Sequence, residues 1–265
     1  MKDILLLVHD DAGQPARLQV AISLARLLDA AVSCIAADET ADYRDDCASL
    51  ADEILADVVR HQSQANHKMI DRLFAKQRID HRWIAMEGPL IDRLCEQAAF
   101  HDLLIINARS TGYGWGDSSI VVSDLVRATN QPLLLVPEAE VTDDLAAHAV
   151  IAWDGSRACI AAMRAAVPLL SKTRRVTMVE FGPHRGGPPI ERGAEYLRRQ
   201  GIAVHTTHDD SLHHPAGWLV SRCRPGRTSY CVMGAFGHSR SREAVFGGVT
   251  MTMLEEVRIP LFIAH

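Results

Sequence analysis

Short continuous runs of apolar residues recur along the first half of the chain, and segments with a helical spacing of apolar residues separate them. A run such as residues 4–8, which is apolar throughout, is typical of a central parallel strand that is buried on both faces. The segment that begins near Pro15 carries Leu18, Ile22 and Leu28 on one side, as an amphipathic helix does. The pattern predicts strands over residues 4–8, 31–36, 81–86, 103–106 and 132–136, and helices over 14–28, 49–77 and 120–129, with one more that begins at residue 88. This alternation indicates an open parallel sheet with helices on both faces.

The second half of the chain repeats this pattern. The apolar run over residues 149–153 ends at Asp154, and a helical pattern over 157–170 follows it as 14–28 follows the first strand. Residues 259–264 resemble residues 130–136 in the same way. Repetition at about half the chain length indicates a tandem duplication of one domain. We therefore expect an α/β protein with domains over residues 1–140 and 147–265, joined by the polar segment 138–147.

A glycine-bounded loop in the second half is the strongest functional signal. It follows the apolar run 230–233 and precedes a helical pattern in which Val249, Met253 and Val257 share one face. A helix N-terminus that points at a loop suits a phosphate, because unpaired amide hydrogens and the positive end of the helix dipole converge there. The glycines that permit close approach of a ligand to the backbone are Gly234, Gly237, Gly247 and Gly248.

The spacing of these glycines excludes the two commonest phosphate loops. No Lys-Ser/Thr follows the last glycine, as a P-loop requires, and the dinucleotide pattern G-x-G-x-x-G does not occur. The spacing Gly-x2-Gly-x9-Gly, followed by Gly-Val-Thr, resembles the ATP-binding signature of the universal stress protein family. The alternative is a glycine-rich turn that binds nothing.

With the duplication, the resemblance extends over essentially the whole chain, which looks like a tandem universal stress protein. It implies two doubly wound, Rossmann-like domains, each a five-stranded parallel sheet with strand order 3-2-1-4-5. It also implies that the ligand binds where the strand order reverses, the location that doubly wound sheets generally use. The implied ligand is ATP, or AMP or ADP, with or without Mg²⁺.

Matching positions to the family pattern suggests individual roles in the second half. Asp154, at the end of the first strand, matches the aspartate that contacts the nucleoside, and Gly155 leaves room beside it. Ser156 offers a hydroxyl, although capping of the next helix explains it equally well. Phe181, at the end of the second strand, matches a position whose backbone meets adenine, and it is also a candidate core residue.

The glycine loop matches the family less completely. Gly234, Gly237 and Gly247 match the three motif glycines, but Gly248 stands where the family usually has Ser or Thr, so a phosphate-binding hydroxyl is missing. Thr250 matches a later hydroxyl. The remaining candidate phosphate contacts are the amide of Val249 and the side chains of His238, Ser239 and Arg240, with Arg242 and Glu243 read as a solvated loop.

The first half departs further from the pattern. Counting back from Pro132, the motif glycines are replaced by Asn107, Ser110 and Ser119, and Ile120 stands at the hydroxyl position. The segment His9-Asp10-Asp11 keeps an aspartate near the first strand. We therefore expect this half to bind ATP poorly or not at all, and to act as a pairing partner or to hold another ligand.

Composition narrows the class of protein. A formal net charge of -5 argues against general nucleic-acid binding, although Arg240 and Arg242 could form a local basic patch. Six cysteines without a C-x-x-C pair indicate free thiols in a reducing compartment. With no signal-like or membrane-spanning segment, we expect a cytoplasmic protein without membrane contact. The histidines and aspartates over residues 205–214 are candidate metal ligands, but the adjacent rings of His213 and His214 diverge, so a polar loop is the preferred interpretation.

These observations favour an adenine-nucleotide-binding stress-response protein that acts as a sensor or interaction module without efficient turnover. We expect the two halves to pair through residues 132–136 and 260–264, which would cover two exposed sheet edges. Homodimerisation and an unidentified protein partner are further expectations. Two alternatives stay open: a slow ATPase or nucleotidyl-transferring enzyme, and a scaffold that has lost its ligand.

Overall fold

The computed structural model describes residues 1–36, 50–84, 89–109, 118–139, 141, 144–181, 187–209, 215–235 and 248–265. In the first half these form β1 (Asp3–Val8), α1 (Gln14–Leu28), β2 (Ala31–Ala36), α3 (Leu50–Gln77), β3 (His81–Ile84), α4 (Leu90–Ala98), β4 (Leu103–Asn107), α5 (Ser118–Thr129) and β5 (Leu133–Val136). In the second half they form β6 (His148–Trp153), α6 (Arg157–Ala165), α7 (Val167–Leu170), β7 (Arg175–Phe181), α8 (Ile190–Arg199), β8 (Val204–Asp209), α9 (Pro215–Arg222), β9 (Tyr230–Gly234), α10 (Gly248–Glu256) and β10 (Leu261–Ala264).

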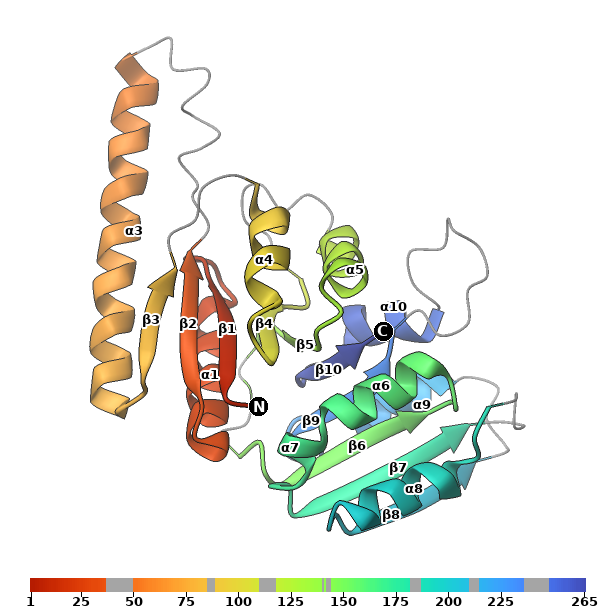
Figure 1. Ribbon diagram of the computed structural model, residues 1–265. Coiled ribbons are helices and arrows are strands. Elements are labelled where there is room, and N and C mark those ends of the chain that lie inside the picture. The colour runs from red at the N-terminus through yellow and green to blue at the C-terminus, as the bar shows by residue number, and fades with distance from the viewer. Residues whose placement is uncertain are drawn as a thin grey trace.

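The strands build one ten-stranded sheet in the order β3-β2-β1-β4-β5-β10-β9-β6-β7-β8 (Figure 1). The order within the first half is 3-2-1-4-5. Read from the other end of the sheet, the second half has the equivalent order β8-β7-β6-β9-β10. The predicted α/β fold and its strand order are therefore confirmed. All pairings within each half are parallel.

The two halves meet at β5 and β10, which pair antiparallel with Leu134 opposite Phe262. This is the pairing of the segments 132–136 and 260–264 that the sequence suggested. It joins two five-stranded sheets into one continuous sheet. The edges of β5 and β10 are therefore hydrogen-bonded to each other inside the chain.

Helices cover the sheet on both faces, as a doubly wound fold requires. One apolar core contains buried residues of α1, α3, α6, α7 and α8, among them Phe74 and Leu197. The core on the other face contains residues of α4, α5, α9 and α10, among them Leu125 and Met253. No helix in the described segments has the length and apolarity that a bilayer crossing requires.

One predicted element is wrong in detail. The single helix expected over residues 157–170 is divided into α6 and α7, with Ala166 between them. Pro168 has no backbone N–H to donate to the carbonyl four residues earlier, so the helix cannot continue unbroken through this point.

Candidate functional site

The chain changes direction across the sheet at β6. From β6 it crosses through α6 to β7 on one face, and from the neighbouring β9 it crosses through α10 to β10 on the other face. The carboxyl ends of β6 and β9 therefore form the topological switch point, which is the usual ligand position in doubly wound sheets. Asp154 directly follows β6, and Gly234 ends β9.

The turn after β6 presents an aspartate at the start of α6. A carboxylate oxygen of Asp154 accepts a hydrogen bond from the Ser156 amide at 2.9 Å, and Gly155 adopts a left-handed conformation with φ of 69°. The Ser156 hydroxyl accepts from the Cys159 amide at 3.1 Å and caps α6, which confirms the capping reading of Ser156. Asp154 itself is exposed to solvent.

The chain after β7 folds back over this turn. Gly187 has a φ of 87°, and a Cβ atom on it would lie 2.5 Å from the Gly155 carbonyl oxygen. The indole of Trp153 donates to the Pro188 carbonyl oxygen at 3.2 Å. Residues 187 and 188 therefore lie beside the turn that carries Asp154, a contact between segments distant in sequence that no local pattern indicated.

The end of β9 lies directly against the first turn of α6. A Cβ atom on Gly234 would lie 2.4 Å from the Cys159 amide nitrogen and 2.7 Å from the Ala158 carbonyl carbon. Glycine at this position is therefore required by packing, independently of any ligand. The same contact brings the beginning of the glycine-rich loop close to the turn that carries Asp154.

The remaining loop residues divide into described and undescribed ones. Gly237, His238, Ser239, Arg240 and Gly247 lie outside the described residues. Gly248 is exposed at the start of α10, Val249 is half-buried, and the Thr250 side chain is buried. The Thr250 hydroxyl, which matches the later hydroxyl of the family pattern, is therefore on a buried side chain, whereas Gly248 is open to solvent.

An aromatic group lies at the carboxyl end of β7. The rings of Phe181 and Trp218 meet edge to face, with centroids 5.0 Å apart, and the Arg222 guanidinium lies 4.9 Å from the centre of the Trp218 ring. Phe181 is half-buried, so it serves both as packing and as a partly open surface. Trp218 reaches this place from α9, and nothing in its local sequence pattern indicated that.

Strand β8 carries three of the candidate metal ligands, His205, His208 and Asp209. The imidazole of His208 lies 3.2 Å from a carboxylate oxygen of the buried Glu180. Within the described segments, no three His, Cys, Asp or Glu side chains are grouped so that they could hold a metal ion. Asp210, His213 and His214 lie outside those segments.

Cys159 lies in the first turn of α6, beside the turn that carries Asp154. Burial, followed by the negative charge of Asp154, raises the pKa of the Cys159 thiol to about 12. The thiol therefore stays protonated near neutral pH and is a poor nucleophile.

The corresponding place in the first half is built differently. The sheet register sets Ile4 opposite Leu103 and Ala149 opposite Tyr230, so Asn107 is the counterpart of Gly234 and His9 that of Asp154. The Asn107 amide donates to the Val136 carbonyl oxygen at 3.0 Å and packs against Gly13, where a Cβ atom would lie 2.3 Å from it.

A buried arginine, Arg17, pairs with an aspartate of that turn, Asp11. One terminal nitrogen of Arg17, Nη1, donates to both carboxylate oxygens of Asp11, each at 3.0 Å. Arg17 also donates to the carbonyl oxygens of Leu7 and His9, and only 1% of it is exposed. Desolvation by burial lowers the pKa of Arg17, and the charge of Asp11 opposes that shift. Asp11 is therefore held by the protein's own cation.

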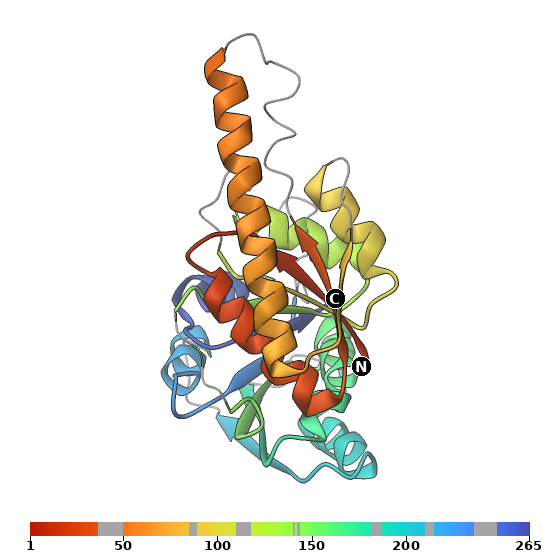
Figure 2. The ribbon, with the colours of Figure 1, turned by 90° about the vertical axis from the view of Figure 1, so that its left-hand side faces the viewer.

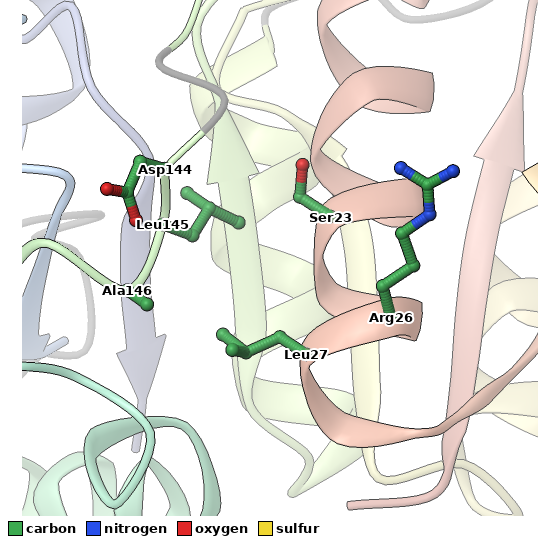
Figure 3. Close-up of a pocket in the computed structure, with 6 residues that line it drawn as sticks. All are labelled: Ser23, Arg26, Leu27, Asp144, Leu145 and Ala146. Atoms are coloured by element: carbon green, nitrogen blue, oxygen red, sulfur yellow. The ribbon is translucent and has the colours of Figure 1, made fainter.

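A cavity of about 290 Å³ lies elsewhere, between the last turns of α1 and the segment before β6 (Figure 3). Its lining residues are Ser23, Arg26, Leu27, Asp144, Leu145 and Ala146. Because α1 runs back toward the amino ends of the strands, this cavity lies near those amino ends, whereas Asp154 lies at the carboxyl end of β6. We therefore do not assign the nucleotide to it.

The fold resembles that of solved proteins, although no protein-family model and no curated protein sequence matches this chain. The crystal structure of a universal stress protein from Archaeoglobus fulgidus DSM 4304 is similar, with a TM-score of 0.74 and 12% identity over 99% of this chain and 97% of that chain. A functionally unknown protein from Pseudomonas aeruginosa PAO1 is similar with a TM-score of 0.59 and 12% identity, over 100% of this chain and 92% of that chain. The chain thus has, over its full length, a fold that is seen in a universal stress protein.

Proposed function

We propose that this chain is a cytoplasmic universal stress protein of the tandem type, and that its second half binds one adenine nucleotide, ATP or its products AMP or ADP. It would act in the stress response as a nucleotide-dependent sensor or interaction module. The resemblance of its whole fold to the Archaeoglobus fulgidus universal stress protein supports this assignment. The glycine spacing over residues 234–250 supports it independently.

One observation carries the placement of the ligand: the end of β9 and the turn of Asp154 meet at the first turn of α6, at the point where the strand order reverses. The exposed Asp154 carboxylate would accept hydrogen bonds from ribose hydroxyls or an adenine amine. Phosphates would lie toward the N-terminus of α10, where Gly248 and Val249 begin the helix. Gly237, Gly247 and the side chains of His238, Ser239 and Arg240 would complete the cradle, with Mg²⁺ as a companion of the phosphates.

The first half is proposed to serve as the pairing partner and not as a second nucleotide site. Arg17 already pairs with Asp11, and the Asn107 side chain, at the position that corresponds to Gly234, packs against Gly13. A nucleotide that used the Asp11 carboxylate would have to break a buried ion pair, which is costly because each charge would lose its partner in a poorly solvated place.

Isothermal titration calorimetry of the full chain with ATP, ADP and AMP tests the proposal. We expect one nucleotide per chain and a loss of binding in Asp154→Asn. Asp10→Asn is the matched control, because Asp10 is an exposed aspartate in the equivalent turn of the first half. Two nucleotides per chain, or equal losses in both variants, would contradict the assignment.

Mass spectrometry of small molecules released from the denatured, freshly purified protein tests which nucleotide the chain carries. A single-turnover assay with labelled ATP tests the enzymatic alternative, and we expect no product above the rate of buffer alone. Turnover that disappears in Asp154→Asn would favour the enzyme over the sensor.

A further inference from the structure

Helix α3 projects beyond the body of the molecule. Its 28 residues span about 42 Å at 1.5 Å per residue, and its first half extends past the ends of β2 and β3 (Figures 1 and 2). From Asn66 onward it is attached to the body: Asn66 and Gln14 exchange side-chain hydrogen bonds, and Ile70 and Phe74 are fully buried. Between Asp57 and residue 65, every residue whose surroundings are described is exposed.

The projecting helix carries an exposed apolar stripe. In the described part of the chain four large apolar side chains are exposed, and three of them are on α3: Ile54 at 58%, Val58 at 46% and Met69 at 44%. Offsets of 4 and 15 residues from Ile54 place these three on one face of a helix, and exposed Ala65, at an offset of 11, joins them. Ile70 and Phe74, on another face of α3, are buried against the body of the molecule. The stripe is therefore a second apolar face of the helix, and it has no partner among the described residues.

We propose that this stripe, Ile54, Val58, Ala65 and Met69, binds the same stripe of a second copy of the chain, with the two helices antiparallel. The spacings along the stripe are 4, 7 and 4 residues, so the pattern reads the same in both directions. A two-fold axis between residues 61 and 62 therefore sets Ile54 against the partner's Met69 and Val58 against the partner's Ala65. A symmetric contact of this kind uses one self-complementary surface twice.

Charge selects the same arrangement. Asp57 and Lys68 are exposed and are 11 residues apart, so they lie on one flank of the stripe. The Asp57 carboxylate also pairs with Arg60 of its own helix at 2.6 Å, and its exposed position leaves room for a second cation. The two-fold axis sets Asp57 level with position 66 of the partner subunit, two residues or about 3 Å along the helix from the partner's Lys68. The attraction occurs twice per dimer. A parallel two-fold arrangement would instead place the flank that carries Asp57 beside the opposite flank of the partner helix, so Asp57 would not meet the partner's Lys68.

The edges of β5 and β10 are already paired inside the chain, and the sheet ends at β3 and β8. Burying the stripe removes apolar side chains from water, and it gives tertiary support to a helical segment that has little of its own. This contact does not depend on the proposed nucleotide, so either proposal can fail without the other.

Sedimentation velocity of the full chain tests the dimer. We expect the wild-type chain to be dimeric and Val58→Lys to be monomeric at the same concentration, because a charge in the centre of the stripe would be buried against its partner. Phe100→Lys is the matched control, since it removes the other exposed large apolar side chain, which is not on α3, and we expect it to remain dimeric. Circular dichroism checks that both variants fold. A monomeric wild-type chain, a dimeric Val58→Lys, or a monomeric Phe100→Lys would overturn the proposal.

Charge reversal tests the antiparallel register. Asp57→Lys and Lys68→Asp should each weaken the dimer by roughly 2- to 30-fold, as expected for two exposed ion pairs. The double variant restores both attractions and should return to within about threefold of the wild-type affinity. Single variants that leave the affinity unchanged, or a double variant weaker than either single one, would overturn the register.

Discussion

Replacing Gly234 by alanine tests the packing of the candidate site most directly. The new methyl group would be placed 2.4 Å from the Cys159 amide nitrogen and 2.7 Å from the Ala158 carbonyl carbon. Both atoms belong to the backbone of α6, so no rotation of a side chain can relieve the overlap. Real Cβ atoms essentially never approach other atoms below 3.0 Å, so α6 or the end of β9 must move.

The cost follows from the tightness of the site. Inserting a methyl group into a well-packed interior costs about 1–3 kcal/mol, and backbone neighbours put this case in the upper part of that range. For a chain of this size each kcal/mol lowers the unfolding midpoint by about 2–4 °C. We therefore expect Gly234→Ala to unfold roughly 4–12 °C below the wild-type chain.

Thermal unfolding followed by circular dichroism, without added nucleotide, measures this difference. Gly248→Ala is the control, because a Cβ atom on Gly248 meets nothing within 4 Å. Alanine is preferred to glycine within a helix by up to about 1 kcal/mol, so this variant should be unchanged or slightly more stable. A Gly234→Ala midpoint equal to that of the wild type would refute the packing argument and leave a ligand as the reason for Gly234.

Three further predictions concern other buried groups. Arg17→Met should lose about 3–5 kcal/mol of stability in urea unfolding, because it leaves Asp11 charged and without its partner, and Asp11→Asn in the same chain should recover part of the loss; no recovery would contradict this. Burial, with a smaller contribution from the charge of Asp71, raises the pKa of the Cys34 thiol to about 12, so the folded state keeps the proton longer than the unfolded state, whose thiol titrates near 9. The free energy of unfolding should therefore be intact below pH 9 and decrease toward pH 12, with a smaller decrease in Cys34→Ala; an equal decrease would count against it. Ser156→Ala should cost about 1 kcal/mol through the lost cap, whereas Ser156→Asp should not, and calorimetric unfolding distinguishes the two.

The local pattern of apolar and polar residues was sufficient to predict much of the architecture. Apolar runs such as Ile4–Val8 identify buried strands because a parallel strand has neighbours on both faces. The repeat of this run before Asp154 indicated the doubled topology, and Ser156 at the start of a helical pattern indicated its cap. Each of these signals depends on residues that are close together in the sequence, so it can be recognised without knowing the fold.

Other features required the folded chain because they join residues distant in sequence. The contact between Gly234 and α6 and the approach of Trp218 to Phe181 both depend on where whole elements are placed. The glycine spacing predicts Gly234 as a ligand contact. The fold shows that the α6 backbone leaves no room for a side chain at this position, which a spacing pattern does not reveal. A periodicity reports which face of an element is buried, but only the tertiary arrangement determines which backbone or charge that face meets.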